Sequence, residues 1–255
     1  MSLLDIKDLT IRFGGLAAVS EFECAFTGGE LMGLIGPNGA GKTTVFNMVS
    51  GFYKPTSGSI VFDGRATAGL KPHQVTALGI ARTFQNIRLW KEMSVLDNIR
   101  VAQYYRLGYG VADCFFRSRR YMTREAEIER TSREILEALE LTRYTDERPS
   151  NLPYGLQRRV EIARALSLKP KLLLLDEPAA GLNSADVEGL IALIRWVHEE
   201  YKLSIWMIEH QMKVVMSLCQ WIKVIDFGRI IAEGTPEQIQ SNPEVIKAYL
   251  GDENI

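Results

Sequence analysis

The sequence contains few cysteines, and their spacing forms no recognisable motif. Cys24, Cys114 and Cys219 are odd in number and lie far apart, and no C-x-x-C pair is present. Structural zinc sites and disulfide-bonded frameworks depend on closely spaced or even-numbered cysteines. The pattern therefore argues against both, and we expect reduced thiols in a cytosolic setting.

Long apolar runs and a strong charge of one sign are also missing. No segment approaches the roughly 18 apolar residues that a membrane-spanning helix needs. Residues 1–8 carry charges where a secretory signal requires an apolar stretch. We expect a cytoplasmic protein whose role at a membrane depends on a partner. The formal net charge of −1 gives no electrostatic reason to expect nucleic acid as the main ligand.

The most informative segment is a phosphate-binding loop of the pattern G-x-x-x-x-G-K-T. Its glycines allow several backbone N–H groups to face one anion, its lysine reaches the β- and γ-phosphates, and its threonine hydroxyl binds Mg²⁺. Apolar residues 31–35 predict a buried strand before the loop, and residues 43–50 predict a helix after it, whose N-terminus favours an anion. The predicted nucleotide-binding residues are Gly36, Pro37, Asn38, Gly39, Ala40, Gly41, Lys42, Thr43 and Thr44.

Around this loop the sequence predicts an α/β fold. Residues 9–13 and 18–26 predict a small antiparallel sheet, whereas residues 96–164 show helical spacing and form a predicted helical insertion. After the insertion, alternating strand and helix patterns predict a parallel sheet. We interpret the chain as one domain, a P-loop NTPase core of residues 1–95 and 165–255 with an antiparallel β subdomain and an inserted helical subdomain. The apolar residues at helical spacing in the insertion include Ile128, Ile135, Leu136 and Leu139.

Two adjacent acids follow an apolar strand predicted at residues 172–175. Ligands of parallel sheets collect at the carboxyl ends of the strands, which is where Asp176 and Glu177 are expected. Asp176 there supports the Mg²⁺ that accompanies the nucleotide. Glu177 is placed to polarise a water molecule for attack on the γ-phosphate.

With these motifs in order, the chain resembles the ATP-binding subunit of an ATP-binding-cassette (ABC) transporter over nearly its whole length. Gln85 in T-F-Q-N matches the glutamine loop of that family, and His210 matches its switch histidine. The resemblance implies ATP and Mg²⁺ as ligands and an ABC ATPase fold. It also implies catalytic roles for Glu177, His210 and Gln85. The implied metal ligands are Thr43, Gln85 and Asp176, and Phe13 lies where the family stacks an aromatic ring on adenine.

The family signature is altered in this chain. In the family, the signature L-S-G-G-Q completes the ATP site of an opposing subunit. Pro153 here lacks both the hydroxyl and the N–H of the usual serine, Leu156 replaces the glutamine, and Asn183 replaces the usual aspartate of a further loop. We therefore expect an asymmetric pair of subunits in which this chain supplies one strong and one weaker half-site. The residues predicted to act on the opposing subunit are Leu152, Pro153, Tyr154, Gly155, Leu156 and Gln157.

Further segments are similar to the ATPases of branched-chain amino-acid importers. They include residues 79–89, 154–164, 176–183 and 234–251. The resemblance implies a second, different ATPase chain, two integral membrane permease subunits and an extracytoplasmic amino-acid-binding protein as partners. It also implies a location on the inner face of the membrane. An importer for another amino acid, urea or an amide, and a weakly catalytic regulatory subunit, remain alternatives.

Two surface features are interpreted differently. Large apolar residues beside Gln85 favour a groove for a cytoplasmic permease helix, whereas the cluster Arg117, Arg119 and Arg120 is interpreted as a solvated face without an assigned role. The apolar set consists of Phe84, Ile87, Leu89, Trp90 and Met93.

Overall fold

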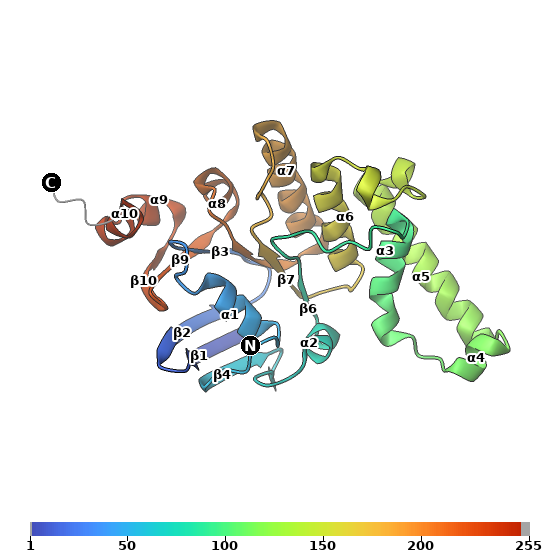
Figure 1. Ribbon diagram of the computed structural model, residues 1–255, viewed down its shortest axis with the longest axis horizontal. Coiled ribbons are helices and arrows are strands. Elements are labelled where there is room, and N and C mark those ends of the chain that lie inside the picture. The colour runs from blue at the N-terminus through green and yellow to red at the C-terminus, as the bar shows by residue number, and fades with distance from the viewer. Residues whose placement is uncertain (1, 251–255) are drawn as a thin grey trace. The chain divides into compact units, whose positions relative to one another are not determined.

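The computed structural model describes residues 2–250, and the chain divides into two compact units (Figure 1). One unit combines Met1–Gln85 with Lys171–Ile255, and the other is Asn86–Pro170. The predicted insertion at residues 96–164 lies within the second unit. Each unit is described by itself below.

The first unit is built on a six-stranded sheet in the order β10-β9-β3-β8-β7-β6. All neighbouring strands are parallel except β9 and β10. Every residue of β3, β7 and β8 is buried, as expected for strands that are covered on both faces. The bounds are β3 (Leu31–Ile35), β6 (Ile80–Arg82), β7 (Leu172–Asp176), β8 (Ser204–Ile208), β9 (Trp221–Asp226) and β10 (Arg229–Gly234).

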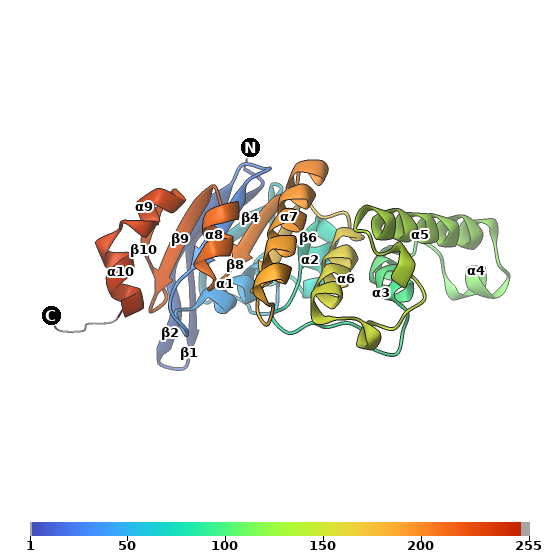
Figure 2. The same cartoon turned by 90° about the horizontal axis from the view of Figure 1, so that it is seen from above.

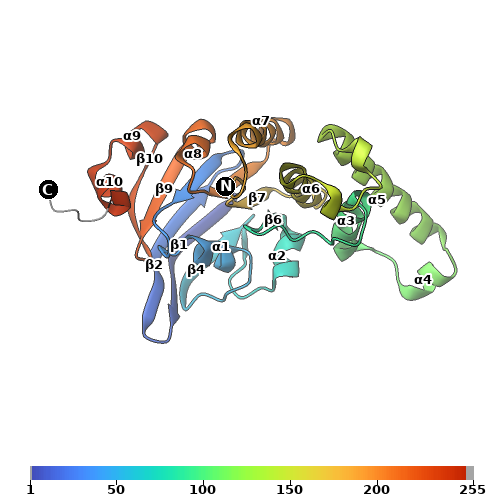
Figure 3. The ribbon, with the colours of Figure 1, turned by 45° about the horizontal axis from the view of Figure 1, so that its top comes forward.

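Helices cover this sheet on both faces. Helices α7 and α8 lie on one face, whereas α1 lies on the other, between the six-stranded sheet and a second sheet (Figures 1 and 3; Figure 2 looks down on α7 and α8). Helix α9 begins with a capping box formed by Thr235 and Gln238, with Pro236 after the cap. The helices of this unit are α1 (Lys42–Val49), α2 (Pro72–Leu78), α7 (Ser184–Tyr201), α8 (Met212–Leu218), α9 (Pro236–Gln240) and α10 (Pro243–Leu250).

The second sheet is antiparallel and has the order β2-β1-β4-β5. Its strands are β1 (Leu4–Phe13), β2 (Leu16–Phe26), β4 (Ser57–Phe62) and β5 (Arg65–Ala66). Strand β1 begins five residues before the predicted range because buried Leu4 and Ile6 pair with β4. Between the sheets, the buried Trp206 packs with ring centroids 6.2 Å from Phe22 and 5.2 Å from Phe46. This aromatic contact fixes α1, and with it the phosphate loop, against the parallel sheet.

The helical unit contains α3 (Val95–Ala102), α4 (Val111–Phe115), α5 (Arg119–Ala138) and α6 (Tyr154–Leu166), with 3₁₀ turns at Gln103–Arg106, Thr142–Tyr144 and Pro149–Asn151. The predicted helical spacing is confirmed, because Ile128, Ile135, Leu136 and Leu139 are all buried. Gln103, which follows α3 at its C-cap, donates through Nε2 to the Ser132 Oγ of α5 at 2.8 Å. Throughout residues 2–250, no helix combines the length and apolar character that crossing a bilayer requires.

Candidate functional site

The predicted phosphate loop connects β3 to α1, as the sequence indicates. Gly41 precedes α1 with a φ of 107°, and a Cβ there would lie 2.7 Å from the carbonyl oxygen of Ala18. Gly36 has a φ of 150°, and a Cβ there would lie 2.0 Å from the carbonyl oxygen of Ile225. Only glycine fits both positions. The tight turn that results leaves the N–H groups at the start of α1 available to an anion.

Lys42 is folded back into the loop. Its buried Nζ donates to the carbonyl oxygens of Gly36 and Pro37, each at 2.8 Å. Burial lowers the pKa of Lys42, and the charges of Glu177 and Asp176 act in the opposite direction. The two carbonyl oxygens carry only partial negative charge, so a phosphate group would be a stronger partner for this ammonium.

Asp176 ends β7 and is held by a residue that the sequence analysis did not identify. The Arg82 guanidinium lies 2.7 Å from Oδ2 of Asp176, and the two side chains are only 6% and 4% exposed. Arg82 ends β6, and it also donates to Asn47 Oδ1 and Ser50 Oγ, each at 2.8 Å. It therefore ties the acid to α1, the helix that follows the phosphate loop. Three rings surround the guanidinium, with centroids at 5.1 to 5.8 Å: Phe46, Phe52 and Phe84.

Glu177 is brought together with the other two predicted catalytic residues. Its Oε2 accepts a hydrogen bond from Gln85 Nε2 at 2.6 Å, and its Oε1 lies 2.9 Å from His210 Nε2. The backbone of Glu177 has a φ of 48°, in the left-handed region that residues other than glycine rarely adopt. Such strain concentrates at functional sites. In this chain it accompanies a carboxylate held at both oxygens.

Glu209 is a second residue that the sequence analysis missed. This carboxylate is 2% exposed, and it accepts backbone hydrogen bonds from Ala179 at 2.7 Å, His210 at 2.7 Å and Gln211 at 3.0 Å. It links the loop after Glu177 to the segment that carries His210. The available signal was an acid placed directly after the apolar strand β8, where an unpaired charge would be costly.

A cavity of about 350 Å³ lies between the phosphate loop, Glu177 and His210. Neither Asp176 nor Gln85 lines it. Phe13 does not line it; the ring is 48% exposed and packs edge-on against Tyr53 at 5.4 Å. The exposed Phe227 lines it instead. The lining residues are Leu16, Ala17, Ala18, Asn38, Gly39, Gly41, Lys42, Thr43, Thr44, Glu177, His210 and Phe227.

The donor atoms suit a magnesium ion that shares its shell with phosphate. The hydroxyl of Thr43, the carboxylate of Asp176 and the amide oxygen of Gln85 are all hard oxygen ligands. Within residues 2–250, no three His, Cys, Asp or Glu residues form a metal-binding group. Mg²⁺ bound to a nucleotide needs only one or two protein carboxylates, because phosphates and water complete its coordination. The residues present therefore fit Mg²⁺.

The segment predicted to be an altered signature lies in the helical unit, at the start of α6. Pro153 occupies the N-cap position, and its side chain makes no capping hydrogen bond. The side chain of Gln157 turns back to the carbonyl oxygen of Leu152 at 2.9 Å. The hydroxyl group of a usual signature is therefore missing here, and the N-terminal amides of α6 are the groups that remain for an anion.

Two families of known proteins match this chain. Residues 19–180 match the family described as "ABC transporter". Residues 229–254 match the one described as "Branched-chain amino acid ATP-binding cassette transporter".

Individual proteins are similar over nearly the whole length. The "High-affinity branched-chain amino acid transport ATP-binding protein BraF" of Pseudomonas aeruginosa is 45% identical, over 98% of this chain and 98% of its own. The corresponding protein LivG of Escherichia coli K12 is 43% identical with the same coverage. A solved nucleotide-free ATP-binding cassette from an ABC transporter superimposes with a TM-score of 0.86 at 28% identity, covering 99% of this chain and 100% of that one.

Proposed function

Because the chain belongs to the ABC transporter family, we propose that it is an ATPase subunit that powers uptake of branched-chain amino acids through a membrane permease. The observation that supports ATP hydrolysis is the position of the Glu177 carboxylate, which is held between Gln85 and His210 at the edge of the phosphate-loop cavity. The amino-acid part is supported by the relatives BraF and LivG and by the C-terminal family match.

In this proposal each residue has its own step. Lys42 exchanges the carbonyls of Gly36 and Pro37 for the β- and γ-phosphate oxygens of ATP. Glu177 orients a water molecule and accepts its proton as the water attacks the γ-phosphorus, and the bond to the β-phosphate oxygen breaks. Gln85 and His210 hold Glu177 in place until the γ-phosphate enters. Bound Mg²⁺ supplies the positive charge that the phosphates need.

The second side of the ATP site comes from a partner in this proposal. The phosphate loop contacts the nucleotide from one side, and a signature segment of another ATPase chain covers the γ-phosphate. Pro153 removes a hydroxyl from the signature that this chain offers in return. The pair is therefore asymmetric, with a different chain as its second member, and the site that this signature completes is the weaker one.

The remaining partners follow from the transporter role. We place the subunit at the inner face of the membrane, bound to two permease subunits that receive amino acids from an extracytoplasmic binding protein. In the helical unit, Trp90 is 47% and Met93 38% exposed. Large apolar side chains exposed in this way suit a permease helix.

Single-turnover hydrolysis tests the proposal. With the assembled transporter and less ATP than sites, Glu177→Gln should keep ATP binding and lose at least about 100-fold in the hydrolysis rate, because it removes the group that accepts the proton. Glu188→Gln, which changes an exposed acid of α7 paired with Lys213, should hydrolyse at the wild-type rate.

Two results would count against this assignment. An unchanged rate in Glu177→Gln removes Glu177 as the base. Failure of the wild-type chain to hydrolyse ATP, with ATP bound, favours the second candidate function, a regulatory nucleotide-binding subunit, which the Pro153 cap also supports.

A further inference from the structure

The segment between α3 and α5 exposes an unusual set of large apolar side chains. We define the tip segment as residues 106–124, which contain α4 and the first turns of α5. Within it, Val111 is 89% exposed, Phe115 81%, Phe116 77% and Met122 54%. Val111 and Phe115 lie one helical turn apart in α4, and the rings of Phe115 and Phe116 pack edge-to-face with their centroids 5.1 Å apart. Contiguous apolar exposure of this kind marks an interaction surface.

The fold of the helical unit keeps these side chains away from its own core. Helix α4 lies at the end of α5 farthest from α6 (Figures 1 and 2). The buried side chains of α5 begin only at Ile128, beyond the tip segment. The four exposed apolar side chains of the tip therefore lie outside the buried core of this unit.

The same segment concentrates positive charge. It contains five arginines, Arg106, Arg117, Arg119, Arg120 and Arg124, and a single acid, Asp113, in a chain whose net charge is −1. That acid is used internally, because its carboxylate accepts hydrogen bonds from the Gly110 N–H at 3.0 Å and the Ser118 hydroxyl at 2.7 Å. The partner of this surface must therefore be both apolar and anionic.

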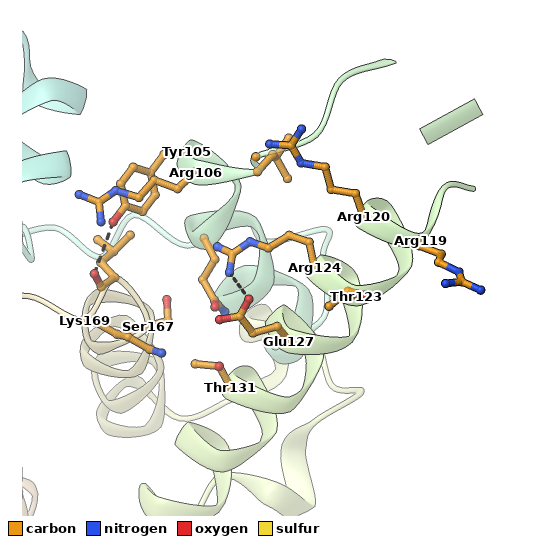
Figure 4. A pocket seen from close by; sticks show the side chains of 14 residues that line it. Tyr105, Arg106, Arg119, Arg120, Thr123, Arg124, Glu127, Thr131, Ser167 and Lys169 are labelled. Atoms are coloured by element: carbon orange, nitrogen blue, oxygen red, sulfur yellow. Dashed lines mark hydrogen bonds and ion pairs between the residues drawn. The ribbon is translucent and has the colours of Figure 1, made fainter. Parts of the chain in front are cut away.

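A cavity of about 720 Å³ lies beside the tip, within the helical unit. Four tip arginines and Lys169 line it, and Glu127 is its one acid. Arg124 neutralises that acid at 2.7 Å. Figure 4 shows Arg124 and Lys169 extending toward Glu127, whereas Arg119 points away from it. The cavity thus keeps an excess of positive charge, some inside and some at its rim, which suits phosphate groups.

We propose that the tip segment binds the surface of an anionic phospholipid membrane. The side chains of Phe115, Phe116 and Val111 enter the boundary between headgroups and acyl chains, and the arginines bind headgroup phosphates. A surface with apolar and cationic side chains on one short helical segment has the character of interfacial membrane-binding helices. A second copy of this chain is a poorer occupant, because two identical basic tips repel each other. The proposal is independent of which solute the transporter carries.

Vesicle flotation with the purified full chain tests this assignment. Vesicles of phosphatidylcholine mixed equally with phosphatidylglycerol should bind the chain, whereas vesicles of phosphatidylcholine alone should bind it at least about tenfold more weakly. Arg119→Gln with Arg120→Gln should lower the affinity about fivefold per arginine, and Phe115→Ser with Phe116→Ser should abolish flotation. A far-ultraviolet circular dichroism spectrum equal to that of the wild type shows that the helices of each variant are folded.

Matched controls separate the tip from the rest of the surface. Arg130→Gln, an exposed arginine of α5 outside the tip, and Ile246→Ser, an exposed apolar residue of α10, should both float as the wild type does. A polarity-sensitive dye on Cys114, the exposed cysteine between Asp113 and Phe115, should shift to shorter wavelength on anionic vesicles only.

Three outcomes would overturn the proposal. The first is wild-type flotation by the Phe115→Ser, Phe116→Ser variant. The second is binding of glycerol phosphate in solution without vesicle binding, which makes the cavity a site for a free phosphate ester. The third is self-association that the same variant abolishes, without vesicle binding, which makes the tip a contact between copies.

Discussion

The ion pair of Arg82 with Asp176 offers the sharpest stability prediction. Arg82→Met keeps the length of the side chain but removes the guanidinium that binds Asp176, Asn47 and Ser50. Because the pair is 6% and 4% exposed, the substitution strands a buried carboxylate. Removing one partner of a buried ion pair costs about 3–5 kcal/mol, so we expect the free energy of unfolding to fall by that amount.

Urea denaturation followed by tryptophan fluorescence measures this loss. Arg229→Met is the matched control, since Arg229 pairs with Glu21 at 3.5 Å with both side chains about two-thirds exposed; it should cost about 0–1 kcal/mol. Asp176→Asn combined with Arg82→Met should cost less than the sum of the single changes, by about 0.5–3 kcal/mol. Two results would refute the reasoning. The first is a fall in the free energy of unfolding that is no larger in Arg82→Met than in Arg229→Met. The second is a double variant whose loss equals the sum of the two single losses.

Three further predictions concern the site and the cysteines. In Glu209→Gln the single amide oxygen cannot accept all three backbone hydrogen bonds that the carboxylate accepts, so the free energy of unfolding should fall by about 2–4 kcal/mol. Hydrogen exchange should become faster at the Ala179 and His210 amides. Unchanged exchange at these amides would argue against a positioning role for Glu209. Gly41→Ala should weaken ATP-analogue binding at least about tenfold because its Cβ meets the Ala18 carbonyl at 2.7 Å, whereas Gly64→Ala, also at positive φ but in open space, should bind normally. Burial raises the pKa of Cys24 and of Cys219 to about 12, so both stay protonated below that pH; native alkylation at about pH 8 should modify Cys114 only, and a Cys114→Ser variant that still reacts at the same rate would contradict this.

The sequence predicted those parts of the site that depend on short, ordered motifs. The phosphate loop, the strand ending in Asp176, and the meeting of Glu177, Gln85 and His210 all follow from local patterns or from the family resemblance. Asp176 ends a buried strand, Glu177 follows it and Lys42 begins a helix, positions that short local patterns predict. Gln85 and His210, in contrast, were located by the family resemblance.

The residues that the sequence did not predict act through partners far along the chain. Arg82 sits on a strand of only three residues, too short for a periodic pattern, and its acid lies 94 positions away. Glu209 meets Ala179, 30 positions away. For the arginine cluster at residues 117–120, charge alone indicated only a solvated face. Its apolar neighbours acquired meaning once the structure showed how fully Phe115 and Phe116 are exposed.

The stacking of Phe13 on adenine remains a prediction, and a comparison of two aromatic residues tests it. Phe227 lines the cavity and is 89% exposed, whereas Phe13 packs against Tyr53. An adenine ring stacks on whichever aromatic it reaches. Separate Phe13→Ala and Phe227→Ala variants, titrated with an ATP analogue, should identify that residue by the larger loss of affinity.

The central claim is that this chain converts ATP hydrolysis into amino-acid uptake. Leucine uptake into proteoliposomes that hold the permease, both ATPase chains and the binding protein measures it directly. With ATP at the ATPase face, the wild-type chain and the Glu188→Gln control should support uptake, and Glu177→Gln should abolish it. Equal uptake with Glu177→Gln, or uptake that continues without this chain, would contradict the claim.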